Sequence, residues 1–269
     1  APAPRSAGAN PGDEMVQIAR ARLDDLLARF GLSGVNWSES GPPALCSPHR
    51  HLTYWSSRWF GEATVGSQTV HVGGRRPAPL APPAGLPSPD DAPWVLITLG
   101  TSFNVDPAFF IAATHAAAAL GCLPLVAVGA PLNTPWVQAM RPRLPAKTVL
   151  APRLDFAAVM PHSAAAIHHG GAGTTHALVT QAVPQIVVPH AADQMRQAQG
   201  VTRCQVGLAI PPKEVTVDRL VAALAQTLPD RSPLRGHAQT LQAEFDALGG
   251  VPAAADELES LHKEKPCKH

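Results

Sequence analysis

A pair of histidines followed by a glycine-rich turn is the segment of this sequence best suited to chemistry. It reads HHGGAGTT over residues 168–175, after an apolar run, and a helix is expected to begin at Thr174 or Thr175. Glycine lets the backbone approach a ligand closely, and a helix start offers unpaired N–H groups and about half a positive charge. The pattern predicts an anion site, most naturally for phosphates. A tight strand-to-helix turn explains the same residues equally well.

Other nucleotide and hydrolase patterns do not fit. The dinucleotide pattern GxGxxG fails because His176 stands where its third glycine would follow Gly171 and Gly173, and GxxxxGK[ST] does not occur. The sequence contains neither a GxSxG elbow nor a paired-carboxylate signature, so no independent pattern supports a hydrolase.

The elements that must position this turn follow from the apolar runs. Continuous rather than alternating apolarity predicts strands buried on both faces, and therefore an α/β fold with a doubly wound parallel sheet and helices on both faces. Three helices are expected after the last strand, near 216–228, 232–248 and 252–262. The six expected strands lie in the runs 94–100, 123–129, 148–152, 164–169, 185–190 and 207–211.

The region before the sheet has a different character. Residues 13–30 have the 3.6-residue period of an amphipathic helix closed by Gly31, and residues 44–74 indicate short strands and loops. Seven prolines between Pro77 and Pro93 suit a stiff linker. The expected organisation is therefore a first domain at 1–76, a linker at 77–93, a sheet domain at 94–262 and a tail at 263–269.

Composition excludes several classes of protein. The formal net charge is +1 without a basic stripe, so nucleic acid is not an expected partner. No apolar run approaches the roughly 20 residues of a transmembrane helix, and the first residues do not resemble a signal peptide. The four cysteines lack the spacing of a zinc site or a disulfide framework, which favours a cytoplasmic location.

Taken together, HHGGAGTT, the later VPQIVVP (183–189) and Asp193-Gln194, preceded by TLGTS (98–102), resemble one family. It is the nucleotide-sugar-dependent glycosyltransferases of the UDP-glycosyltransferase superfamily, which have the GT-B fold. The resemblance covers about 13–262. It implies a Rossmann-like donor-binding half at 94–262, with residues 1–76 as a remnant of an N-terminal acceptor-binding domain.

The resemblance also implies a set of donor-binding residues. His169 would touch the donor diphosphate and stabilise the leaving group, and Asp193 with Gln194 would bind sugar hydroxyls, although an aspartate there also suits a helix cap. Phe156 would contact the base or serve as a core residue, and Asp155 replaces a common proline. His168 is expected to face the other way as a structural residue. The expected donor-binding residues are Thr101, Ser102, Arg153, Phe156, His169, Gly170, Gly171, Gly173, Thr174, Thr175, Asp193 and Gln194.

The implied reaction is transfer of a sugar, with inversion, from a dTDP- or UDP-sugar to an acceptor hydroxyl, with neither metal nor cofactor. Ala177 stands where plant members have a ribose-binding glutamate, which suits a deoxyribose. The family's histidine base lies in a part of the N-terminal domain that this chain does not match, so a missing domain or a partner chain is expected. His49 and His51 match nothing in the family and are expected to be surface or strand histidines.

The acceptor is expected to be a small molecule or a lipid. Two further functions fit the same donor residues. One is a non-catalytic nucleotide-sugar-binding module acting with a partner chain. The other is an epimerase or hydrolase that acts on the same donor.

Overall fold

The computed structural model describes residues 11–31, 36–37, 45–46, 50–61, 68–102, 104–228 and 232–263. The chain divides into two units. Unit 1 comprises Ala1–Leu52 and Val65–Val70, and unit 2 comprises Thr53–Thr64 and His71–His269.

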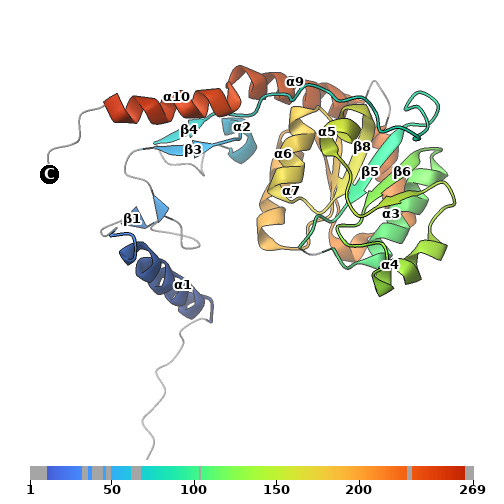
Figure 1. The fold of residues 1–269 in the computed structure, drawn as a ribbon, viewed down its shortest axis with the longest axis horizontal. Coiled ribbons are helices and arrows are strands. Elements are labelled where there is room, and N and C mark those ends of the chain that lie inside the picture. Colours follow the sequence, from blue (N-terminus) through green and yellow to red (C-terminus); the bar gives the residue numbers. More distant parts are fainter. Residues whose placement is uncertain are drawn as a thin grey trace, which may run out of the picture. The chain divides into compact units, whose positions relative to one another are not determined.

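Unit 2 is built on a six-stranded parallel sheet with the strand order β10-β9-β8-β5-β6-β7 (Figure 1). All six predicted runs contain strands, so the predicted α/β class and parallel sheet are confirmed. Thr98 at the end of β5 pairs with Ala127 of β6 and His168 of β8, which brings the three strand ends level. The strands are β5 (Trp94–Thr98), β6 (Leu123–Ala127), β7 (Val149–Ala151), β8 (Ser163–His168), β9 (Gln185–Val187) and β10 (Gly207–Ala209).

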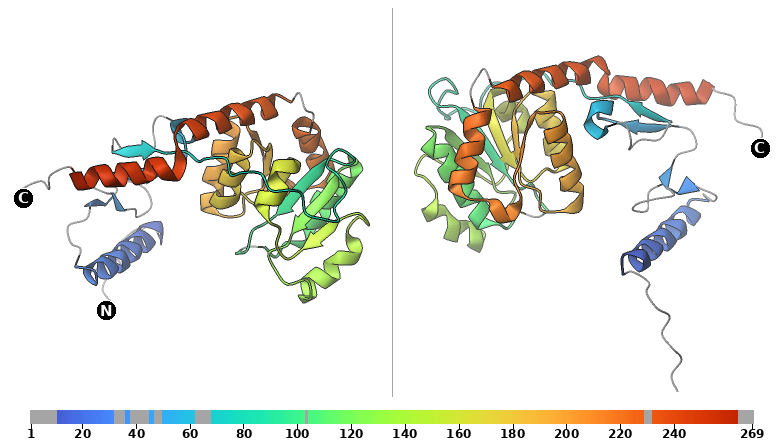
Figure 2. Two further views of the ribbon diagram at one scale, coloured as in Figure 1. Left: turned by 45° about the horizontal axis from the view of Figure 1, so that its top comes forward. Right: turned by 180° about the vertical axis from the view of Figure 1, so that it is seen from behind.

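Helices cover both faces of the sheet (Figures 1 and 2). Along β5, Val95 and Ile97 join one core with α3 and α8, whereas Trp94 and Leu96 join another with α6. This is why the strands are apolar throughout rather than alternating. The helices are α3 (Pro107–Ala119), α4 (Pro135–Met140), α5 (Phe156–Val159), α6 (Ala172–Thr180), α7 (Ala192–Arg203), α8 (Val217–Thr227), α9 (Pro233–Ala247) and α10 (Gly250–Lys263), with 3-10 turns at Arg141–Arg143, Met160–His162 and Pro212–Glu214.

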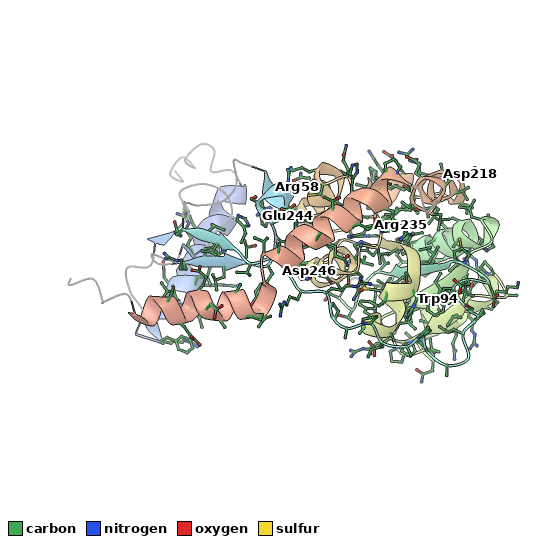
Figure 3. All side chains as sticks on the ribbon, turned by 90° about the horizontal axis from the view of Figure 1, so that it is seen from above. Arg58, Trp94, Asp218, Arg235, Glu244 and Asp246 are labelled. Carbon is green, nitrogen blue, oxygen red and sulfur yellow. The ribbon has the colours of Figure 1, made fainter. Side chains whose placement is uncertain are left out.

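A short helix, α2 (Ser57–Phe60), belongs to unit 2 although it precedes the prolines. The side chain of Trp59 is 1% exposed in a core that includes residues of α7 and α9, and its indole N–H donates to Gln197 Oε1 at 3.1 Å. Arg58 pairs with Glu244 of α9 at 3.1 Å, and Figure 3 labels both. The structure therefore does not divide at the prolines, in contrast to the predicted boundary.

The proline-rich segment 77–93 belongs to unit 2 and packs against the rest of that unit. The carbonyl of Pro87 accepts from the Trp94 indole at 3.1 Å, the amide of Leu80 donates to the Ala157 carbonyl at 3.4 Å, and Leu86 packs on the core beneath α6. An extended, proline-fixed backbone thus lies along the sheet domain instead of separating two domains.

Unit 1 contains α1 (Pro11–Ala28), which matches the predicted amphipathic helix, and Gly31 follows it with φ 68°. Strands β1 (Asn36–Trp37) and β2 (Leu45–Cys46) pair antiparallel. Strands β3 (His51–Thr53) and β4 (Thr69–His71) form a second two-stranded sheet, through which the division between the units passes. His51 begins β3, whereas His49 and residues 264–269 of the expected tail lie outside the described residues. In the described part of the chain, the helices lack the combination of length and apolarity that a membrane crossing requires.

Candidate functional site

Two adjoining cavities lie at the carboxyl ends of the strands. The chain leaves β5 for α3 on one face of the sheet and β8 for α6 on the other, so a crevice forms between these neighbouring strands, as at the switch point of other doubly wound sheets. The larger cavity, of about 450 Å³, is lined by Thr98, Gly100, Thr101, Ala127, Gly129, Pro152, Arg153, Leu154, Phe156 and Thr174. The smaller cavity, of about 360 Å³, is lined by Gly100, Thr101, Ser102, His169, Gly171, Ala172, Gly173, Thr174, Asp193 and Gln194.

The imidazole of His169 is packed against two glycines. A Cβ on Gly100 would lie 2.8 Å from His169 Cε1, and a Cβ on Gly171 would lie 2.4 Å from His169 Nε2. Neither position can carry a side chain while the ring stays where it is. The ring is thereby held between the turn after β5 and the turn after β8, at the wall of the smaller cavity.

The surroundings of His169 favour its neutral imidazole form. Burial lowers its pKa most strongly and the nearby charge of His190 lowers it further, whereas Asp193 and the Thr98 carbonyl act in the opposite direction. Its Nδ1 is buried and has no hydrogen-bond partner of ordinary geometry within the described residues. A neutral ring can donate one hydrogen bond to a ligand.

The start of α6 faces the smaller cavity. The helix begins at Ala172 with Gly171 as its N-cap, so the prediction of Thr174 or Thr175 was wrong by two or three residues. The first backbone hydrogen bond of the helix runs from Thr175 N to Gly171 O at 2.9 Å. The amides of the three residues before Thr175 have no intrahelical partner, and all three residues line the smaller cavity. This is the geometry of an anion site.

The three glycines of the turn have different roles. Gly170 has φ 87°, and a Cβ there would lie 2.7 Å from Val187 Cγ1, so this position is restricted by its own backbone and by the core. Gly171 makes room for His169. A Cβ on Gly173 would meet nothing within 4 Å, so Gly173 alone of the three borders open space. The predicted close approach of backbone to ligand therefore applies chiefly to Gly173.

Two predicted donor-binding residues do not line either cavity. Gly170 lies beneath the turn. Thr175 is fully buried, and its hydroxyl donates to the Gly171 carbonyl at 2.9 Å, so it supports the turn instead of offering a free hydroxyl. The structure brings the other ten predicted residues to one cavity or the other.

His168 is a structural residue, as predicted. Its side chain is fully buried, its Nε2 lies 3.0 Å from Gln185 Oε1, and its Nδ1 accepts from Gly170 N at 3.1 Å. Since Nδ1 is an acceptor, Nε2 carries the proton. Burial is the main cause that lowers the pKa of His168, to about 3.

At the start of α7 the capping role belongs to Gln194, not Asp193. Gln194 Oε1 accepts from His190 N at 2.7 Å and from Ala191 N at 3.1 Å. Asp193 is the second residue of the helix and is exposed at the smaller cavity, so the alternative prediction of an aspartate cap was wrong. Its carboxylate is available for a polyol ligand.

At the larger cavity, Phe156 lines the cavity and packs on the core beneath α6, so its predicted place in the core is confirmed. Its contact with a base stays a prediction. Asp155 caps α5, accepting from Ala157 N at 2.9 Å. Asp155 therefore has a local structural task at the position where the sequence resemblance implies a proline.

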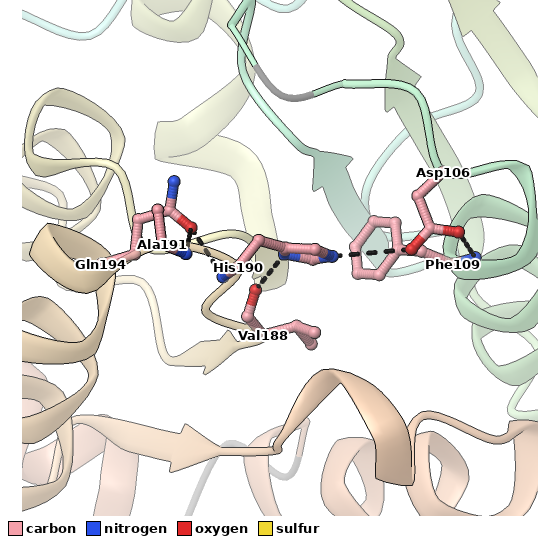
Figure 4. Close-up of polar contacts among 6 residues, drawn as sticks. All are labelled: Asp106, Phe109, Val188, His190, Ala191 and Gln194. Carbon is pink, nitrogen blue, oxygen red and sulfur yellow. Dashed lines mark hydrogen bonds and ion pairs between the residues drawn. The ribbon is translucent and has the colours of Figure 1, made fainter. Parts of the chain in front are cut away.

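Sequence reasoning missed a pair beside the smaller cavity. His190, which follows β9, donates from Nδ1 to the Val188 carbonyl at 2.8 Å, and its Nε2 lies 3.5 Å from Asp106 Oδ2 (Figure 4). The only sequence signal was the position of His190 at the end of an apolar run. No group of three potential metal ligands occurs among the residues that the structure describes.

Residues 137–259 match the family described as erythromycin biosynthesis protein CIII-like, C-terminal domain. The chain is 31% identical over 266 residues to the L-demethylnoviosyl transferase of Streptomyces niveus, a match that covers 94% of this chain and 63% of that protein. The chain thus spans about three fifths of the length of this relative.

Solved structures share the fold. The calicheamicin glycosyltransferase CalG4 has a TM-score of 0.70 at 23% identity, over 96% of this chain and 62% of that chain. The glycosyltransferase VinC, solved in complex with dTDP, has a TM-score of 0.57 at 25% identity, over 76% of this chain and 50% of that chain.

Proposed function

Because the chain belongs to the superfamily of nucleotide-sugar-dependent glycosyltransferases with the GT-B fold, we propose that it forms the donor-binding part of a glycosyltransferase. The observation that carries the proposal is the joint presence, at the smaller cavity, of His169, the open start of α6 and Asp193. The diphosphate would lie on the amides at the start of α6, the sugar beside Asp193 and Gln194, and the nucleoside in the larger cavity beside Arg153 and Phe156.

In this arrangement the chain's own groups would stabilise the departing nucleoside diphosphate. Negative charge grows on the leaving group as the glycosidic bond breaks, so donors that already face the phosphates stabilise the transition state more than the ground state. Those donors are the amides at the start of α6, the hydroxyls of Thr101 and Thr174, and the imidazole of His169. Each helix-end interaction contributes about 0.3–2 kcal/mol, so several must act together. The proposed reaction is metal-independent and inverting.

For the donor we propose a dTDP-sugar or a UDP-sugar. Ala177, at the position where plant members have a ribose-binding glutamate, packs on the neighbouring core and offers no polar group, which suits a deoxyribose. VinC, which shares the fold, was solved with dTDP.

We further propose a small-molecule acceptor, which the names of the matched relatives support. The acceptor pocket and the general base are proposed to come from a separate domain or partner chain. A cytoplasmic location stays a prediction.

Calorimetric titration of the chain with dTDP, UDP and their glucose conjugates tests the proposal. We expect one of the two nucleotides to bind, and His169→Gln to weaken that binding by about tenfold, which corresponds to about 1.4 kcal/mol. Asp193→Asn should weaken a sugar conjugate more than the free nucleotide. His115→Gln, on the outer face of α3, is the matched control.

Each outcome of the titration bears on a different part of the proposal. Absence of binding for both nucleotides would overturn it, as would unchanged binding by His169→Gln. Markedly tighter binding of UDP than of dTDP would overturn only the deoxyribose preference.

A further inference from the structure

His190 is fixed from several sides. Its amide donates to Gln194 Oε1 at 2.7 Å, its Nδ1 donates to the Val188 carbonyl at 2.8 Å, and its Nε2 lies 3.5 Å from Asp106 Oδ2. Its ring also meets that of Phe109 edge to face, with centroids 6.3 Å apart. The side chain is only 21% exposed. So many contacts leave the imidazole one orientation.

Asp106 uses its two carboxylate oxygens for two different tasks. Oδ1 accepts from Phe109 N at 3.0 Å and so caps the start of α3, while Oδ2 faces His190 (Figure 4). Two positions earlier, Asn104 donates to the Val128 carbonyl at 3.2 Å. The described residues that follow Thr101 and Ser102 are therefore tied both to the end of β6 and to the turn between β9 and α7.

The contacts of His190 already engage both ring nitrogens. Nδ1 donates to the Val188 carbonyl, and Nε2 faces the carboxylate of Asp106. A ring held in this way can position other groups without taking part in the chemistry itself.

We propose that the His190–Asp106 pair is a positioning device for the diphosphate end of the donor. The pair joins two segments of the chain. One is the start of α7, which carries Asp193 and Gln194, and the other is the segment after β5, which carries Thr101 and Ser102. All four of these residues line the smaller cavity. The pair thereby fixes the separation of the two walls. This inference rests on the proposed function, and His190 and Asp106 act through these neighbours rather than by touching the donor.

The test uses two conservative variants of the full chain. Asp106→Asn keeps an oxygen that can cap α3 but loses the carboxylate, and His190→Gln keeps a side-chain donor but loses the imidazole ring. Each should weaken dTDP or UDP binding by about threefold to tenfold, the size of a typical coupling between neighbours. The double variant should lose no more than either single variant. Thermal unfolding of Asp106→Asn should stay close to that of the wild type.

A comparison of ligands separates positioning from general damage. Thymidine and uridine lack the diphosphate and are expected in the larger cavity, so their binding, measured by competition, should not change. Glu244→Gln is the matched control, because it breaks the ion pair with Arg58 between α2 and α9, neither of which contributes a lining residue to the two cavities. It should bind dTDP and UDP as the wild type does.

Three outcomes would overturn the positioning role: nucleotide binding unchanged in both single variants, an equal loss for nucleoside and nucleoside diphosphate, or losses that add up in the double variant. In each of these cases the wild type still binds the nucleotide, so the proposed function survives. If the wild type binds neither dTDP nor UDP, both proposals fail.

Discussion

Gly171 illustrates, at the scale of single residues, how a glycine-rich turn can serve a neighbouring side chain rather than a ligand. Its φ of −60° is accessible to any residue, so backbone strain does not explain the glycine. The reason is the 2.4 Å that would separate an added Cβ from His169 Nε2. Glycine is therefore required at this position because the His169 imidazole occupies the space that a Cβ would need.

We predict that Gly171→Ala displaces the His169 ring and weakens nucleoside diphosphate binding by about tenfold. Overpacking at this contact should also lower the free energy of unfolding by about 1–3 kcal/mol. Calorimetry and denaturant unfolding measure the two effects. Gly236→Ala in α9 is the control, because its Cβ would meet nothing within 4 Å. Wild-type affinity in Gly171→Ala would show that the ring position does not matter for binding.

His168 makes stability depend on pH. Its folded pKa of about 3 lies below the ordinary value of 6.5, so the unfolded chain binds the proton more tightly. The stabilising contribution is complete above pH 6.5 and is lost as the pH falls toward 3, by up to about 1.4 kcal/mol per pH unit. The pKa values of His169 and His176 are also lowered, which adds to the loss in the same direction.

We therefore predict that His168→Gln has a shallower decline of unfolding free energy between pH 6.5 and 4 than the wild type. Denaturant unfolding at several pH values measures the slope, which does not depend on the absolute stability of the variant. Equal slopes would contradict the assignment. NMR of the wild type is a second measurement, in which the His168 ring should not titrate between pH 8 and 5.

At the scale of elements, the sequence predicted the strands better than the details of the site. Continuous apolar runs are a local signal of a parallel sheet, and every run contained its strand. The start of α6 was missed because a glycine cap and two small residues carry no apolar period. The pair of His190 and Asp106 was missed because 84 positions separate two residues that meet only after the sheet has formed.

The docking of α2 on α7 depends on Gly200. A Cβ there would lie 2.2 Å from Trp59 Cε2, so the indole occupies the space of a side chain. We predict that Gly200→Ala lowers the unfolding free energy by about 1–3 kcal/mol, although alanine is the better helix former. In a Trp59→Leu background the same change should become neutral or stabilising. Denaturant unfolding of the wild type, the two single variants and the double variant measures this reversal. An equal loss of unfolding free energy in both backgrounds would contradict it.

At the scale of the whole molecule, proline content was a poor guide to the division of the chain. Seven prolines predict a stiff, extended segment, and that prediction of local conformation does not specify what the segment lies against. Leu86 and the Pro87 carbonyl hold this segment against the sheet domain. The buried Trp59 places residues that precede the prolines in the same unit. The boundary between the units is set by side chains that are buried against residues far away in the sequence. A local sequence pattern does not contain such contacts.

A nucleotide that binds as proposed should leave a distinct pattern of amide hydrogen exchange in the full chain. At a concentration 100 times the Kd it stabilises the bound state by about 2.7 kcal/mol. We expect slower exchange at four turns that follow different strands of one sheet, whereas the amides of α1 in unit 1 should exchange at unchanged rates. Mass spectrometry of peptides with and without dTDP or UDP measures both. Protection confined to one turn, or present equally in α1, would contradict a ligand seated across the strand ends. The four turns are 99–102, 152–156, 169–174 and 190–194.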